Sequence, residues 1–224
     1  MITLTEENYL KAIYHLTLEK NQVSVNELSK YLKIKMPSVN SMMKKFAAKN
    51  WVIYESYKPL RMTAEGHLFA SQVVRKHRLT EMFLTEKMGF GWDQVHEIAE
   101  EVEHIKSDIF FDRIDKILGY PKTDPHGSPI PDKNGNIFNQ NLQKLSDCNI
   151  GDKMKFTALA ESSAEFLKFL NKQALPLNTD LVVISVEDFD GSMVIGYNNR
   201  QETFSKMVCE KILVNNQDAE KAIK

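Results

Sequence analysis

The residues best suited to metal chemistry lie in the segment HEIAEEVEH, residues 96–104. Four of its side chains follow the spacing i, i+4, i+7 and i+8, which predicts one shared helix face: His96, Glu100, Glu103 and His104. The last three would offer a divalent cation two carboxylates and a neutral imidazole. Such an oxygen-rich set suits manganese or ferrous iron better than soft metals.

A second pair of metal-binding residue types, His77 and Glu81, has i, i+4 spacing in the preceding predicted helix. Two helices that each present His and Glu on one stripe can form a metal site between them. The alternative is that both clusters are solvated helix faces, since Glu and His are common there. Together the clusters contain three of the six histidines, which favours a metal site.

Motifs of several enzyme classes are missing. The pair His96-Glu97 is followed at the zinc-hydrolase spacing by Glu100 rather than His, so HExxH is absent. A carboxylate-bridged di-iron enzyme needs two Glu-x-x-His motifs, and only Glu101–His104 is present. GxSxG, GxxxxGK[ST] and GxGxxG do not occur. We therefore expect a protein that is not an enzyme.

The elements that position these residues begin with three predicted helices. Apolar residues near a 3.6 period indicate helices over residues 5–19 and 25–32, and Ser24 is suited to cap the second. Pro37 suits the first turn of a third helix, which we expect to end near Lys49.

A hairpin and a long helix follow. Two strands, residues 51–54 and 60–62, surround a predicted turn at residues 56–59, and a helix then runs over residues 63–87. Helix, helix, turn, helix, hairpin is the winged helix-turn-helix pattern, whose third helix enters the DNA major groove.

Charge is distributed unevenly along the chain. The net charge is −1, yet residues 1–76 contain 12 Lys and Arg against six Asp and Glu. Residues 30–49 contain six lysines and no acid, which indicates a polyanion-binding surface. Ser and Asn can contact base edges, whereas lysines mostly neutralise phosphates. The expected DNA-binding residues are Lys35, Pro37, Ser38, Asn40, Ser41, Lys44, Lys45 and Lys58.

Three further regions complete the chain. Residues 92–118 are predicted helical with a break near Ser107, and they end in an apolar stripe that forms either internal core or a dimer face: Ile109, Phe110, Ile114, Ile117 and Leu118. Residues 119–145 are rich in Pro, Gly, Asn and Asp, which is typical of a linker or an ordered loop. Residues 146–217 have short β-rich runs around one predicted helix, which indicates a small β-barrel.

The composition is that of an ordinary soluble protein. The 224 residues allow one large domain or two to three small ones, and 42% are hydrophobic and 26% charged. With only two cysteines, a disulfide scaffold and a Cys-rich zinc site are excluded. We expect no membrane span and no signal peptide, because apolar runs are short and MITLTEENYL lacks a basic region. A cytoplasmic location follows.

Several stretches resemble the diphtheria toxin repressor family of metal-dependent transcriptional regulators, especially its manganese-responsive three-domain branch. They are NYLKAIYHL, the winged segment 24–66, RKHRLTEMFL, QVHEIAEEVEHIKSD and IDKILGYPKTDPHGSPIP. The resemblance implies an α+β multidomain fold. Its parts would be a winged helix-turn-helix domain (1–73), a helical dimerisation and metal-binding domain with linker (74–145), an SH3-like β-barrel (146–217) and a tail (218–224).

The resemblance also implies a function. The protein would be a homodimeric repressor that binds double-stranded palindromic operator DNA and controls manganese or iron homeostasis. Its corepressor would be Mn(II) or Fe(II), with Mn(II) favoured because Glu100 stands where iron-type members carry Cys. We also expect Zn(II) to bind in vitro.

The family's metal ligands map onto residues of this chain. The primary site would use Glu100, Glu103 and His104 with Asn8, and His77 close by; manganese-type members usually carry Asp at the Asn8 position. The second site would use Glu81, Asp124, His126 and a barrel ligand placed at Glu161, with Glu165 as its competitor. His96 matches a ligand of the ancillary site in iron-type members.

Two other functions remain open from the residues alone. One is a winged-helix regulator that responds to a small non-metal ligand, with the His and Glu clusters as solvated faces. The other is a metal-binding buffer or enzyme without a regulatory role, in which the helical head only contacts proteins.

Overall fold

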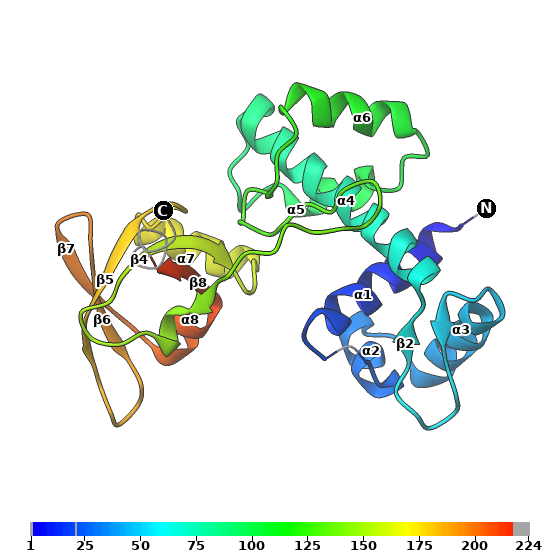
Figure 1. The fold of residues 1–224 in the computed structure, drawn as a ribbon, viewed down its shortest axis with the longest axis horizontal. Coiled ribbons are helices and arrows are strands. Elements are labelled where there is room, and N and C mark those ends of the chain that lie inside the picture. Colours follow the sequence, from blue (N-terminus) through cyan, green and yellow to red (C-terminus); the bar gives the residue numbers. More distant parts are fainter. Residues whose placement is uncertain (1, 21, 217–224) are drawn as a thin grey trace. The chain divides into compact units, whose positions relative to one another are not determined.

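The computed structural model of the protein describes residues 2–20 and 22–216 (Figure 1). These residues form two compact units. The first lies within residues 1–80, 97–122 and 130–138, and the second within 81–96, 123–129 and 139–224. Among the helices so described, none is long and apolar enough to cross a membrane.

The first unit begins with the predicted winged helix-turn-helix order, which is confirmed. Its elements are α1 (Leu4–Lys20), α2 (Val25–Leu32), α3 (Met36–Ala48), β1 (Val52–Ile53), β2 (Arg61–Met62) and the start of α4 (Ala64–Met88). Ser24 caps α2 in a capping box with Glu27, and Pro37 lies in the first turn of α3. Asn50 ends the third helix region with a left-handed φ of 58°.

One apolar core holds these elements together. Leu10 and Ile13 of α1 are buried with Leu28 of α2 and with Met43 and Phe46 of α3. Gly66 lets α4 approach the hairpin closely, because a Cβ there would lie 1.9 Å from the Trp51 carbonyl oxygen. The close packing of α4 on the hairpin therefore requires a glycine at this position.

The helical region after α4 differs from the prediction. Instead of beginning near residue 92, α5 spans His96–Val102, and α6 spans Asp108–Ile117 with Ser107 as its N-cap. Glu103 and His104 therefore lie beyond the end of α5. The prediction of one continuous helix face from His96 to His104 is wrong, because the Ile105 N–H bonds to Val102 in a tight turn that ends the helix.

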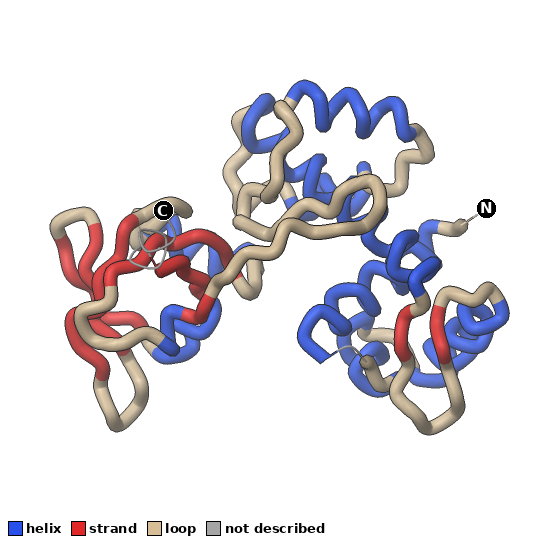
Figure 2. Tube along the Cα trace, in the orientation of Figure 1, coloured by secondary structure: helices blue, strands red, loops and turns tan. Residues whose placement is uncertain are grey.

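The core of the second unit is a six-stranded antiparallel sheet in the order β3-β8-β4-β5-β6-β7, drawn in red in Figure 2. Its elements are β3 (Gln143–Lys144), the 3₁₀ helix η1 (Leu145–Asp147), β4 (Lys153–Leu159), α7 (Ala164–Lys172), β5 (Asp180–Val186), β6 (Met193–Tyr197), β7 (Arg200–Phe204), α8 (Lys206–Lys211) and β8 (Ile212–Asn216). The sheet is consistent with the predicted SH3-like domain.

Some elements of this sheet were not predicted. The single predicted helix of this region is α7, and α8 was not predicted, nor were the short strand β3 and the polar strand β7. Asn215 and Asn216, near the end of the range predicted for the barrel, belong to β8 and pair with β4. The predicted tail, residues 218–224, and residue 217 before it lie outside the described residues.

The segment rich in Pro and Gly is an ordered loop. Residues 123–129 pack in the second unit, where the Leu159 N–H of β4 donates to the His126 carbonyl at 3.0 Å. Gly127 has a φ of +84°, and a Cβ there would lie 2.2 Å from the Thr157 carbonyl oxygen. The loop therefore holds Asp124 and His126 in fixed positions beside β4.

Candidate metal sites and DNA-binding surface

The second unit contains a buried cluster of metal-binding side chains. Glu81 of α4 lies with Asp124 and His126 of the loop, and these residues are only 3%, 5% and 2% exposed. One ligand atom from each lies within 4.8 Å of the other two. Two carboxylates and an imidazole at this spacing form an oxygen-rich set that fits a divalent cation.

Backbone groups fix the orientation of this cluster. The His126 Nε2–H donates to the Trp92 carbonyl at 2.9 Å, which turns Nδ1 toward Glu81 Oε2 at 3.7 Å and Asp124 Oδ1 at 3.9 Å. Asp124 Oδ1 in turn accepts the backbone N–H groups of His126 and Ser128. A backbone carbonyl that orients a metal-binding imidazole is a common supporting contact in metal sites.

The charge around His126 favours a cation at this position. Burial lowers the pKa of the His126 imidazole, but the carboxylates of Glu81 and Asp124 outweigh burial, so its pKa is raised above the ordinary value. The cluster therefore stabilises a positive charge between its carboxylates.

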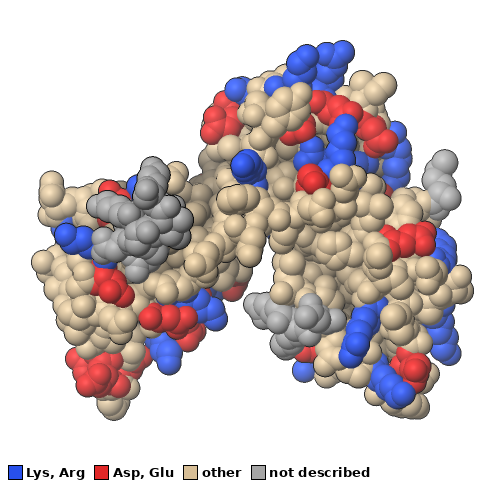
Figure 3. All heavy atoms as spheres, in the orientation of Figure 1, with Lys and Arg blue, Asp and Glu red and all other residues tan. Residues whose placement is uncertain are grey.

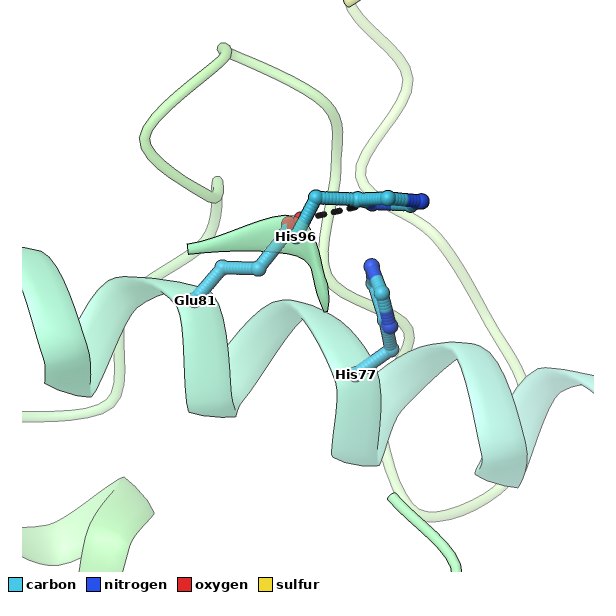
Figure 4. Close-up of side chains that lie close together, drawn as sticks. All are labelled: His77, Glu81 and His96. Atoms are coloured by element: carbon cyan, nitrogen blue, oxygen red, sulfur yellow. Dashed lines mark hydrogen bonds and ion pairs between the residues drawn. The ribbon is translucent and has the colours of Figure 1, made fainter. Parts of the chain in front are cut away.

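His96 lies beside this cluster. Its Nδ1 is 3.3 Å from Glu81 Oε1, while the other carboxylate oxygen faces His126. Figure 4 shows this contact, with His77 one turn before Glu81 on α4. The imidazole of His96 is 60% exposed, so it lies at the solvent side of Glu81.

The predicted barrel ligand is not part of the cluster. The carboxylate of Glu161 pairs with Lys211 at 2.9 Å and is 54% exposed. Its competitor Glu165 lies in the first turn of α7. Neither belongs to a group of potential ligands among the residues that the structure describes.

The first unit holds a second buried cluster around Glu103. The Glu103 side chain is fully buried, and its Oε2 lies 2.6 Å from Nδ1 of His77. Glu100, His77 and Glu103 have ligand atoms within 4.8 Å of one another. The structure thus brings together three of the residues assigned to the primary site.

His104 and Asn8 take different partners. The Nδ1 of His104 is 2.7 Å from Oε2 of Glu7, a buried residue of α1 that also pairs with Lys106. His104 Nε2 is 3.7 Å from Glu103 Oε1. The Oδ1 atom of Asn8 is buried and has no hydrogen-bond partner among the described residues.

Lys11, which the sequence reasoning did not include, lies within this cluster. Its ammonium is 2.6 Å from Glu100 Oε1, 2.6 Å from Glu103 Oε1 and 2.9 Å from Glu103 Oε2. These carboxylates thus already bind a cation that belongs to the chain. The cluster as it stands does not fit a divalent ion, whereas the cluster of Glu81, Asp124 and His126 does.

The predicted DNA-binding residues lie on and around α3. All are exposed except the half-buried Asn40, which accepts a hydrogen bond from the Tyr54 hydroxyl at 2.7 Å. The ammonium of Lys45 lies 3.1 Å from buried Glu6, and Lys58 pairs with Glu55 in the hairpin. In Figure 3 the part that contains α1 to α3 shows several separate basic side chains among mostly uncharged residues, with a few acidic ones.

The apolar stripe on α6 divides into two faces. Phe111 and Ile114 are buried within the first unit, whereas Ile109, Phe110 and Ile117 are 75%, 40% and 55% exposed. The stripe therefore contributes both to internal core and to an exposed apolar surface.

Two family models match consecutive parts of the chain. Residues 1–60 match a family model described as the N-terminal DNA-binding domain of iron-dependent repressors. Residues 63–132 match the metal-binding and dimerisation domain of the same family. Both descriptions concern repressors rather than enzymes.

Individual relatives agree with these matches. The diphtheria toxin repressor of Corynebacterium jeikeium is 32% identical over 127 residues, which are 57% of this chain and 53% of that protein, so the chain spans about half its length. The HTH-type transcriptional regulator MntR of Shouchella clausii is 34% identical over 117 residues, 52% of this chain and 79% of that protein.

A solved structure extends the similarity to the C-terminal sheet. A manganese-dependent transcriptional repressor in complex with manganese superimposes with a TM-score of 0.85 at 27% identity, covering 94% of this chain and 99% of that one. The resemblance noted in the sequence, including the three-domain branch, is thereby confirmed. The chain belongs to the iron-dependent repressor family, which includes the diphtheria toxin repressor and MntR.

Proposed function

We propose that this chain is a metal-dependent transcriptional repressor that acts in the cytoplasm and controls manganese or iron homeostasis. The observation that carries the proposal is the buried cluster of Glu81, Asp124 and His126 in a member of a DNA-binding repressor family. Burying two carboxylates is unfavourable unless a cation compensates them, so a divalent ion would stabilise this arrangement.

The metal would bind in the second unit through Glu81, Asp124 and His126, with His96 at its solvent side. Mn(II) and Fe(II) are the proposed corepressors, and the oxygen-rich donor set favours Mn(II). The residues Asn8, His77, Glu100, Glu103 and His104 form the proposed primary site, where Lys11 must be displaced before an ion can bind. Glu161 would serve as a further ligand of this ion only after its ion pair with Lys211 breaks.

DNA would be bound by α3 and the hairpin of a dimer. Ser38, Ser41 and Lys44 are exposed on α3, where serines suit base edges and a lysine suits a phosphate. The exposed Ile109 and Ile117 of α6 are suited to pair with a second copy. A two-fold dimer reads a palindromic operator, because each recognition helix contacts one half-site.

Metal can raise operator affinity only if it binds the DNA-competent state better than other states. A coupling of roughly 1–3 kcal/mol, typical of allosteric proteins, corresponds to a 5- to 150-fold change in affinity.

The test is fluorescence anisotropy with DNA from upstream of the protein's own gene, at one fixed salt concentration. We expect binding to strengthen at least fivefold when Mn(II), or Fe(II) under anaerobic conditions, replaces chelator. The variant Glu81→Gln should lose most of this response, whereas the exposed Glu86→Gln on the same helix should retain it. Equal operator binding in metal and in chelator would contradict the proposed function.

A further inference from the structure

We propose that the ammonium of Lys11 is an internal competitor for divalent cations at Glu100 and Glu103. The ammonium joins α1 to the segment after α5 when no metal ion is bound. It also weakens the binding of metal ions to Glu100 and Glu103. This inference rests on the proposed function, because it concerns the regulation of the primary site.

The contacts of Lys11 carry the argument. Its side chain is 12% exposed, and its ammonium has three oxygen contacts of 2.6, 2.6 and 2.9 Å to Glu100 and Glu103. An ammonium has three donors, and three acceptors at these distances satisfy all of them. The lysine is therefore fully bonded inside the cluster rather than lying over it on a solvated helix face.

Glu103 leaves little room for a second cation. Its Oε1 binds Lys11, and its Oε2 binds both Lys11 and His77 Nδ1. A divalent ion that used these oxygens would lie within about 4 Å of the ammonium, and like charges at that distance repel strongly because the protein screens them less than water does. Lysine and metal therefore exclude each other.

The bridge connects the DNA-binding core to the ligand segment. Lys11 lies on α1, and its neighbours Leu10 and Ile13 are fully buried in the core that also contains α3. Glu103 lies 92 residues further along the chain. In the metal-free protein, the Lys11 ammonium therefore connects α1 to the segment that carries Glu103. A bridging metal ion would otherwise supply this connection.

Asn8 offers a further candidate ligand on the helix that carries Lys11. Its buried Oδ1 has no hydrogen-bond donor among the described residues, although a buried acceptor is normally paired. A carbonyl oxygen on the same helix, three residues before Lys11, is a suitable ligand for Mn(II).

The test measures Mn(II) binding to the full chain in a Glu81→Gln background, which disables the second-unit cluster. The electron paramagnetic resonance signal of free Mn(II) reports binding, and Mn(II)-induced change in Tm provides a second readout. We expect Lys11→Met to raise Mn(II) affinity at least tenfold and to create a Tm increase with Mn(II). Lys11→Arg keeps the positive charge and the pairing with the carboxylates, so it should bind Mn(II) as weakly as the parent. It also serves as a folded variant if Lys11→Met disturbs folding.

Lys133→Met is the matched control, because Lys133 also pairs with an acid, Asp112, yet is 65% exposed and outside the cluster. It should leave Mn(II) affinity unchanged. Equal or lower affinity in Lys11→Met than in its parent would overturn the inference, as would strong binding in Lys11→Arg.

Operator binding by the same set of chains with an intact Glu81 separates the two proposals. A metal response in the otherwise unchanged chain supports the proposed function whatever the effect of Lys11. Gain of Mn(II) binding in Lys11→Met without operator binding by any chain would support the inference and contradict the proposed function.

Discussion

The buried carboxylate of Glu6 links the N-terminal helix to the recognition helix, and its removal should destabilise the protein in a pH-dependent way. Glu6 is 1% exposed, and its Oε1 lies 2.5 Å from Lys49 and 3.1 Å from Lys45. Burial raises the pKa of this carboxyl, but the hydrogen bonds from Lys49, Thr3 and Lys45 outweigh burial. The net effect lowers the pKa of Glu6 from 4.5 to about 2.

The magnitude follows from proton linkage. A carboxyl with a lowered pKa stabilises the folded state fully above its unfolded pKa of 4.5, and this stabilisation is lost as the pH falls toward 2. The shift corresponds to about 3 kcal/mol at 1.36 kcal/mol per pKa unit. Because Lys45 and Lys49 are 52% and 34% exposed, solvent screening reduces the expected contribution to about 2–3 kcal/mol.

The assay is urea unfolding of Glu6→Gln and the unchanged chain, followed by circular dichroism between pH 7 and pH 3. We expect Glu6→Gln to lower the free energy of unfolding by about 2–3 kcal/mol at pH 7 and by about 1 kcal/mol at pH 3, where the folded-state carboxyl is still mostly ionised. Glu55→Gln removes an exposed pair with Lys58 and should cost less than about 1 kcal/mol. A loss for Glu6→Gln that is the same at both pH values would refute the electrostatic reasoning.

Three further predictions follow from single contacts. Lys44→Ala should weaken binding to all DNA sequences and reduce the slope of log K against log salt by about one, measured by anisotropy; an unchanged slope would exclude a phosphate contact. Gly66→Ala should lower the free energy of unfolding by more than about 2 kcal/mol in urea, because its Cβ would overlap the Trp51 carbonyl. Arg75→Met should cost about 3–5 kcal/mol in the same assay by leaving Asp115, which it contacts at 2.5 Å, buried without this partner; retention of stability would show that the pair contributes little.

The winged helix-turn-helix part was readable because its signals are local. Ser24 caps α2 through groups three residues away, and Pro37 fits the first turn of α3 because of its own ring. Apolar periodicity then identified which faces of these helices are buried. Strand β7, with the sequence RQETF, was not readable because most of its side chains are polar and only its pairing with β6 makes it a strand.

The resemblance grouped Glu81 with Asp124 and His126, and the structure brings these three side chains together. The spacing of ligand types along the sequence did not by itself identify that group. Spacing placed His96 with Glu100 and Glu103, whereas in the structure its imidazole lies beside the Glu81 carboxylate of α4. Glu161 was assigned through the resemblance, and its proposed role stays a prediction, since the structure pairs its carboxylate with Lys211.

The sequence by itself determined the order of the N-terminal elements, the basic surface of the third helix and the ligand types available to a metal. Those properties depend on hydrogen bonds and periodicity within a few residues. The resemblance implied that Glu81 lies with Asp124 and His126, but only the tertiary structure decided that all three are buried, and that Lys11 binds Glu103. These pairs join residues 40 or more positions apart, and in the sequence Lys11 resembles any lysine on a solvated helix. Which charges meet in a buried cluster is fixed by the packing of distant elements, because local spacing carries no information about those contacts.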